Sequence, residues 1–208
     1  MDFAFVSSIV LVLGVVFVNG WTDAPNAIGS AVGTRAMTPR SAILMAVVFN
    51  FLGVLLMTSI SAKVADTISN MVDLTGSSTQ SLTSNGNAII VLAAAMFAIV
   101  VWATGAWYFG IPTSESHSLI AGLTGAALAL GGFSSVNAQA WAKVLVGLGV
   151  SSVLGFFLGW ILVRIIEKIA WNANRFRAER IFHKLQVAAA ALMAFLHGAQ
   201  DGQKFMGV

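Results

Sequence analysis

Residues 144–163 read VLVGLGVSSVLGFFLGWILV, a run of 20 residues with no charged side chain. A helix needs about 20 such residues to cross the apolar part of a bilayer. Similar apolar blocks recur along the chain, at about residues 3–18, 41–60, 88–103, 118–130 and 185–196. The pattern predicts an all-α membrane protein, a polytopic helical bundle without a separate soluble domain.

The composition agrees with this fold class. Hydrophobic residues make up 58% of the chain and charged residues 9%, whereas soluble domains carry about 25% charged residues. The sequence has no cysteine, which excludes disulfides, thiolate metal sites and cysteine nucleophiles. Six of the eleven Lys and Arg residues lie within 164–184. Such a cluster beside a membrane segment indicates topology rather than nucleic-acid binding.

The apolar blocks and the basic residues together predict the organisation of the chain. Residues 1–163 form a first transmembrane repeat of about five membrane segments, including a broken or re-entrant element at 105–131. Residues 164–184 form a basic, amphipathic cytoplasmic connector, and residues 185–208 begin a second repeat. Residues 61–87 form a solvated loop. Arg35 and Arg40 mark a second cytoplasmic turn.

A first polar motif, GWTDAPNAIG at 20–29, carries a carboxylate toward the membrane. Asp23 and Asn26 are three residues apart and share a helix face. Pro25 frees a backbone carbonyl nearby, and the resulting oxygen ligands suit sodium or a proton relay. The alternative is a loop that begins at Gly20, with Asp23 capping the next helix.

A second motif, HGAQDGQKFMG at 197–207, echoes the first, with Asp201 matching Asp23. The crossing count between them is odd, so the two helices run in opposite directions. This is the geometry of an inverted repeat, in which sites form where interrupted helices meet. Two roles remain open for Lys204: pairing with Asp201 one turn away, or supplying positive charge to an anion.

A third motif, GIPTSESHS at 110–118, precedes an apolar helix. Hydroxyl groups and unpaired amides at a helix start favour an oxyanion. The ordinary alternative is N-capping by Ser or Thr after a proline turn. In that interpretation His117 is a satisfied core histidine and Glu115 faces water.

With these three motifs the sequence resembles the inorganic phosphate transporter family, the cation-coupled Pit-type permeases. That family has two Gly-Ala-Asn-Asp-like signatures in oppositely oriented halves and a Ser/Thr-rich stretch ending in His. Thr22 and Gln200 stand where the family usually has Asn, and Pro25 where it has a small residue. The resemblance covers the first half of the family pattern and the start of the second. It therefore indicates a truncated product, a fragment, or one part of a split transporter.

The resemblance implies roles for individual residues. Asp23, Asn26 and Asp201 are implied in binding the driving cation, with Asp23 and Asp201 as metal ligands if that cation is sodium. The implied substrate-binding residues are Thr113, Ser114, Ser116, Asn26, Gln203 and Lys204.

The resemblance further implies a secondary active transporter of the cell membrane that imports inorganic phosphate with sodium or a proton. No enzymatic activity and no cofactor beyond the coupling cation are expected. The expected partners are phosphate, the lipid bilayer, and a second copy or a separate second-half chain. The alternatives are a sulfate or other oxyanion permease, an inactive truncated fragment, and an intramembrane aspartyl protease built on Asp23 and Asp201. The protease is disfavoured because it gives the Ser/Thr motif no role.

Overall fold

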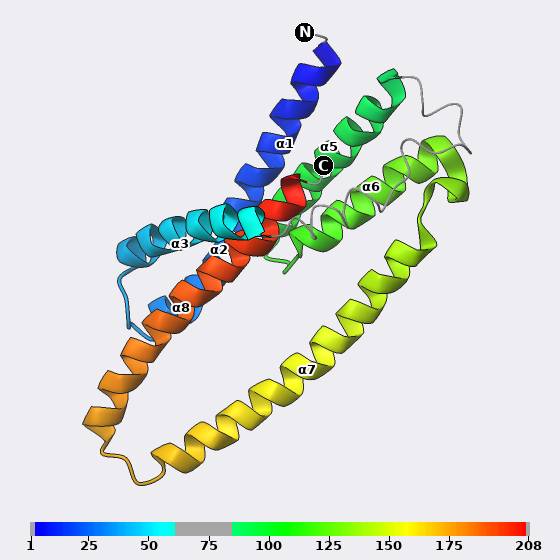
Figure 1. Ribbon diagram of the computed structural model, residues 1–208. Coiled ribbons are helices and arrows are strands. Elements are labelled where there is room, and N and C mark those ends of the chain that lie inside the picture. Colours follow the sequence, from blue (N-terminus) through cyan, green and yellow to red (C-terminus); the bar gives the residue numbers. More distant parts are fainter. Residues whose placement is uncertain (1–2, 61–84, 207–208) are drawn as a thin grey trace.

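The computed structural model describes residues 3–60 and 85–206. Every regular element in these residues is a helix: α1 (Phe3–Thr22), α2 (Ala24–Gly33), α3 (Pro39–Ile60), α5 (Asn85–Tyr108), α6 (Glu115–Gly131), the 3₁₀ helix η1 (Gly132–Ser135), α7 (Ala138–Ala170) and α8 (Arg175–Met206). Figure 1 shows their arrangement. Most of the loop expected at 61–87 lies outside the described residues, and its last three residues begin α5.

The prediction of an all-α polytopic membrane protein is confirmed. Within the described part of the chain, five spans are long and apolar enough to cross a membrane: Val6–Gly33, Pro39–Ile60, Ile89–Tyr108, Ala138–Ala170 and Arg175–Phe205. Large apolar side chains remain exposed along most of them. This exposure is expected of helices that face lipid, since a bilayer makes a broad apolar surface favourable.

The break between α1 and α2 falls at Asp23. α1 continues through Gly20 to Thr22, so the alternative of a loop beginning at Gly20 is wrong. Pro25 lies in the first turn of α2, where it removes a backbone donor from the helix. The backbone hydrogen bonds that continue from α1 therefore end with the one from Asp23 N to Asn19 O at 3.0 Å, and α2 starts a new set.

α5 and α6 are separated by a break at residues 109–114 and form a V in Figure 1. Gly110 has a positive φ of 67°, a conformation that glycine adopts without strain. Pro112 follows and cannot donate a backbone hydrogen bond. The predicted interruption is thus confirmed, and a buried cluster from α1, α5, α6 and α7 holds the V together: Val15, Ala95, Met96, Ile99, Leu119, Ile120, Leu123, Ala127 and Ala140.

α3 and α8 cross at very short range. A Cβ atom added at Gly198 of α8 would lie 2.1 Å from the carbonyl oxygen of Asn50. One added at Gly53 of α3 would lie 2.1 Å from the carbonyl oxygen of Phe195. Small residues at helix crossings let backbones approach closely in membranes. The crossing fixes α8 against α3, and so sets the depth at which the polar side chains of α8 lie.

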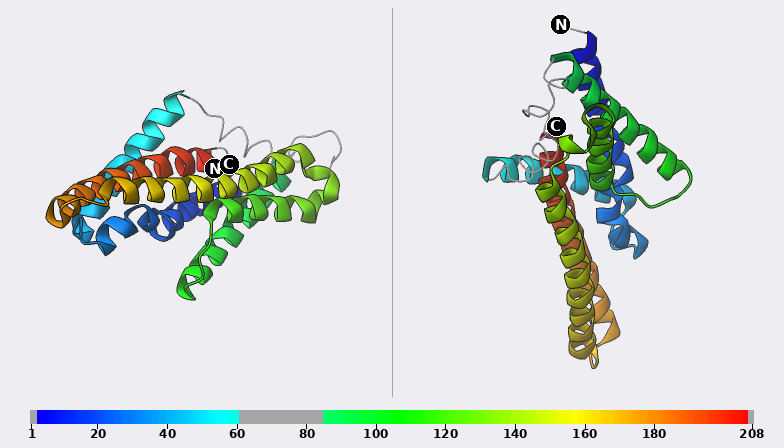
Figure 2. Two further views of the ribbon diagram at one scale, coloured as in Figure 1. Left: turned by 90° about the horizontal axis from the view of Figure 1, so that it is seen from below. Right: turned by 90° about the vertical axis from the view of Figure 1, so that its right-hand side faces the viewer.

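The segment 164–184 differs from the sequence-based expectation. It forms no separate helix: α7 continues to Ala170, a turn follows, and α8 begins at Arg175. Asn174 ends the turn because its Oδ1 accepts a hydrogen bond from Phe176 N at 3.0 Å, as an N-cap does. The joined ends of α7 and α8 project from the rest of the molecule (Figure 2). The cytoplasmic location of this end and the division into repeats remain predictions.

Candidate functional site

Polar side chains from three distant segments meet near the centre of the described structure. They come from the end of α1 and the break after it, from the start of α6, and from the C-terminal part of α8. Hydrogen bonds join them over 88 to 182 residues of sequence. All three predicted motifs therefore contribute to one cluster.

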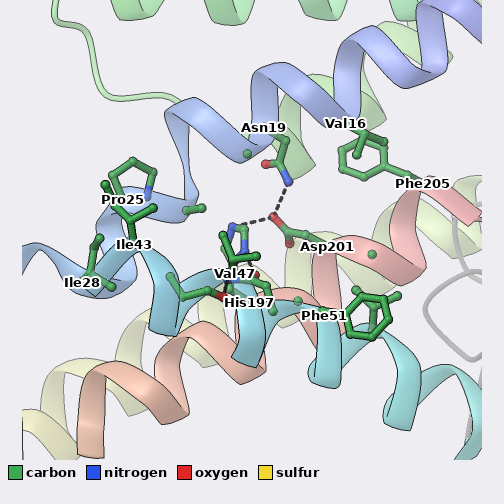
Figure 3. Close-up of a pocket in the computed structure, with 17 residues that line it drawn as sticks. Val16, Asn19, Pro25, Ile28, Ile43, Val47, Phe51, His197, Asp201 and Phe205 are labelled. Atoms are coloured by element: carbon green, nitrogen blue, oxygen red, sulfur yellow. Dashed lines mark hydrogen bonds and ion pairs between the residues drawn. The ribbon is translucent and has the colours of Figure 1, made fainter. Parts of the chain in front are cut away.

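Asp201 is the most connected residue of the cluster, with 8% of its surface exposed. Asn19 Nδ2 donates a hydrogen bond to Asp201 Oδ2 at 3.3 Å. His197 Nε2 lies 3.2 Å from the same oxygen, and Lys204 forms an ion pair with Oδ1. Figure 3 shows Asn19 and His197 directed toward the Asp201 carboxylate.

Lys204 connects α8 to the start of α6. Its ammonium group contacts Asp201 and also donates to Ser116 Oγ. The two roles left open by the sequence are therefore compatible. The ammonium is paired one turn away and is also held beside a hydroxyl of the third motif.

Asp23 occupies the N-cap position of α2, but its side chain makes no capping hydrogen bond. Its Oδ2 instead accepts from the backbone N–H of Glu115 at 3.4 Å, the first residue of α6. Unpaired amides at a helix start attract anions. The start of α6, which the sequence predicts as an anion site, thus holds a carboxylate of the protein itself.

Glu115 and His117 have exchanged the environments expected for them. Glu115 is 1% exposed and His117 is exposed. Thr22 Oγ1 lies 3.5 Å from Glu115 Oε1. The expectation failed because the direction in which α6 buries its first turn depends on α1, which is about 90 residues away in sequence.

Ser114 and Thr113 are used structurally. Ser114 is the N-cap of α6, since its side chain accepts from His117 N at 3.5 Å. Thr113 Oγ1 accepts from Trp102 Nε1 at 2.9 Å, which joins the break to α5. The ordinary capping alternative therefore holds for Ser114, while Ser116 alone among these hydroxyls contacts the cluster.

Two other predicted residues, Asn26 and Gln203, differ in their burial. Asn26 is exposed on α2 and makes no side-chain hydrogen bond or ion pair with the described residues. Gln203 is 3% exposed and lies within α8. Their roles in binding remain predictions.

The sequence reasoning did not assign roles to Asn50, Asn19 and His197. His197 Nδ1 lies 2.8 Å from Asn50 Oδ1, while Asn50 Nδ2 donates to Ala46 O at 2.8 Å. The amide therefore presents its oxygen to the ring, and Nδ1 carries the proton. The available signal was an Asn in the middle of the apolar block 41–60, because polar residues inside membrane helices are commonly functional.

The cluster has the composition of a site for a hard cation. Ligand atoms of Asp23, His197 and Asp201 lie within 4.8 Å of one another. Asn19 Oδ1 is buried and has no hydrogen-bond partner among the described residues. Carboxylate and amide oxygens suit hard cations. The metal-ligand roles of Asp23 and Asp201 remain predictions.

A cavity of about 380 Å³ lies beside the cluster, between α1, α2, α3 and α8 (Figure 3). Its walls are mainly apolar, and its polar lining comes from Asn19, Asn50, His197 and Asp201. Lys204 and Ser116 are not part of the lining. The cavity therefore borders the carboxylate side of the cluster rather than its anion-facing groups.

Known proteins resemble the chain over nearly all its length. The model of the Phosphate transporter family matches residues 19–208. A Bacillus subtilis protein named "Probable low-affinity inorganic phosphate transporter" is 34% identical over 100% of the chain and 60% of its own length. The Escherichia coli "Low-affinity inorganic phosphate transporter PitA" is 33% identical over 92% of the chain and 42% of its own length.

A solved structure, "The sodium-dependent phosphate transporter", shares the fold with a TM-score of 0.72 at 20% identity. It is matched over 98% of this chain and 56% of its own length. The chain spans about half the length of most of the curated relatives it matches. These relatives are transporters and not enzymes, which leaves the protease hypothesis without support. With its family match from Asn19 to the last residue, the chain belongs to the Phosphate transporter family.

Proposed function

We propose that this chain forms the first part of a transporter that imports inorganic phosphate together with a cation, sodium or a proton. One observation carries the proposal: the Lys204 ammonium bridges Asp201 on α8 and Ser116 at the start of α6. Asp201 carries a carboxylate, which is a group that binds cations, whereas the start of α6 is a helix terminus of the kind that binds anions. The bridge therefore joins the two kinds of site.

Charge compensation is the physical basis of the coupling. Burying a phosphate dianion in a medium of low dielectric is costly unless opposite charge accompanies it. Asp23, Glu115 and Asp201 supply three carboxyl groups against one ammonium group, Lys204. A cation bound by the carboxylates reduces the negative potential, so that phosphate binds more readily beside it. This reciprocal dependence of the two affinities is what couples their movement.

The substrate side of the site is the first turn of α6. Phosphate there accepts hydrogen bonds from Ser116 and from the backbone N–H of Glu115, which now bonds to Asp23. It also meets the ammonium of Lys204. Movement of the Asp23 carboxylate from this amide to a bound cation exposes the anion-binding groups. Cation binding thereby prepares the site for phosphate.

The test is uptake of labelled phosphate by liposomes that contain the purified chain. Three conditions are compared: an inward sodium gradient, an inward proton gradient, and no gradient. Uptake that depends on one gradient identifies the coupling cation. Excess sulfate in the same assay separates a phosphate transporter from a general oxyanion permease, because sulfate inhibits only the latter strongly.

Because the chain matches only part of the length of its relatives, the experiment needs a second comparison. The chain is reconstituted alone and together with a separately expressed C-terminal half of the Bacillus subtilis relative. Uptake only in the joint sample indicates that the site is completed by a second half. Uptake by the chain alone indicates that copies of it suffice. Absence of gradient-dependent uptake in both samples contradicts the proposal.

A further inference from the structure

Glu115 is a buried acidic residue whose carboxyl group has almost no partners. It is 1% exposed, and its Oε2 has no hydrogen-bond partner among the described residues. An ionised carboxylate accepts several hydrogen bonds in water, and burial without replacements is unfavourable. A positive charge or a donor is therefore needed at Oε2.

The nearest hydroxyl does not meet that need. Thr22 Oγ1 lies 3.5 Å from Glu115 Oε1 but only 2.9 Å from the carbonyl oxygen of Val18. A hydroxyl has one proton to donate, and the shorter contact with the helix backbone uses it. The Thr22 oxygen then faces Glu115 with its lone pairs, as a second ligand of a shared cation does.

The neighbouring carboxylate increases the need for positive charge. Asp23 follows Thr22 in the chain and accepts from the backbone N–H of Glu115 at 3.4 Å. No Lys or Arg of the described residues forms an ion pair with Asp23 or Glu115. Lys204 is engaged with Asp201 and Ser116.

A further oxygen without a partner lies on the same helix face. Asn19 is three residues before Thr22, so their side chains share one side of α1, and Asp23 follows Thr22 at the break. Asn19 is 5% exposed, and its Oδ1 has no hydrogen-bond partner among the described residues. Two buried acceptors, one from α1 and one from α6, are thus left without donors in the same polar cluster.

We propose that Glu115 is a ligand of a hard cation of the sodium type, in a site completed by Asp23, the Thr22 hydroxyl and the Asn19 amide oxygen. This inference rests on the proposed cation-coupled function and adds a ligand from α6 to it. Because the cation then bonds to both α1 and α6, its binding ties together the two elements on which the substrate side depends. Sodium is favoured by the all-oxygen set of donors.

Sodium binding is measured without transport, on the purified chain in detergent. The thermal unfolding midpoint is recorded against sodium chloride, with choline chloride keeping the ionic strength constant. We expect sodium to raise the midpoint of the unmodified chain. In Glu115→Gln, the sodium concentration for half of the effect is expected to rise about tenfold or more, since a neutral amide replaces a charged ligand.

The matched control is Glu167→Gln. Glu167 is exposed and pairs with Arg164 at 3.3 Å on the projecting end of α7, so its removal leaves the sodium response unchanged. Far-UV circular dichroism and gel filtration establish that Glu115→Gln is folded. If it is not, Glu115→Asp retains the carboxylate, and an intermediate sodium response supports the same conclusion.

Two results overturn the inference. One is an unmodified chain that responds to pH in choline but not to sodium, which assigns a proton to this position. The other is a folded Glu115→Gln variant with the same sodium response as the unmodified chain. Where Glu115→Gln does not fold, the same result in a folded Glu115→Asp variant overturns the inference. Sodium-driven phosphate uptake in such a variant leaves the proposed function standing. Sodium binding that depends on Glu115, in a chain that moves no phosphate either alone or together with the separate second half, refutes the function and retains the site.

Discussion

Asn19 on α1 donates a hydrogen bond to Asp201 on α8 at 3.3 Å, across 182 residues of sequence. The bond joins the helix that carries the first signature to the helix that carries the second. In a membrane interior such bonds have no water to compete with them. The two signatures are therefore parts of one site, and the variants below test how its members depend on each other.

Replacing Asp201 by Asn should destabilise the chain, because Lys204 loses its ion pair while its side chain remains only 16% exposed. Removing one partner of a buried pair costs about 3–5 kcal/mol. The thermal unfolding midpoint measures the loss. The double variant Asp201→Asn, Lys204→Met removes both charges and should recover most of it. Equal instability of the single and double variants would show that the pair is not the cause.

Replacing Asp23 by Asn should abolish gradient-driven phosphate uptake while the protein remains inserted in the membrane. The Asn side chain still accepts from Glu115 N but no longer offers a negative charge to a cation. Uptake by liposomes measures the effect, and Glu179→Gln on the exposed start of α8 serves as the charge-removal control. Normal coupled uptake by Asp23→Asn would rule out its cation role.

Replacing Asn50 by Leu should lower the thermal unfolding midpoint. The His197 Nδ1–H then loses the acceptor that lies 2.8 Å away. A buried donor left without a partner costs about 1–3 kcal/mol, which corresponds to roughly 2–4 °C per kcal/mol in a chain of this size. Asn50→Asp retains an acceptor oxygen and should be less affected than Asn50→Leu. If both variants unfold at the midpoint of the unmodified chain, this bond does not support the site.

Two glycine substitutions should differ in their effect on stability. Gly198→Ala places a Cβ atom 2.1 Å from the carbonyl oxygen of Asn50, so α3 and α8 must separate, at a cost of about 1–3 kcal/mol or more. Gly155→Ala on α7 meets nothing within 4 Å and should be neutral or slightly stabilising, because Ala favours helices. Thermal unfolding of both variants, side by side, measures the difference. Equal midpoints would contradict the tight crossing.

Much of the fold follows from local patterns. Charge-free blocks of about 20 residues require membrane helices, because only a helix satisfies its own backbone in lipid. The interruptions near Pro25 and at 109–114 follow from proline and glycine chemistry, and the structure has both. The ends of α7 and α8 were predicted less well, since amphipathic spacing at 164–184 suits an interfacial helix as well as the ends of two long ones.

The residue types of the site were also visible in the sequence, as a carboxylate in each signature and hydroxyls at a helix start. Their partners were not, because contacts such as His197 with Asn50 join residues 147 positions apart. The exchange between Glu115 and His117 has the same origin. Helical spacing separates the two side chains into different directions, but only the packing of α6 on α1 decides which direction is buried.

Local sequence thus determined that the chain is a set of membrane helices with breaks at defined residues, since bilayer thickness and backbone hydrogen bonding act on short segments. The tertiary structure alone decided that Asp23, Glu115, Asp201 and Lys204 belong to one site. Burial and pairing of charged groups depend on the positions of helices that the chain brings together from its two ends.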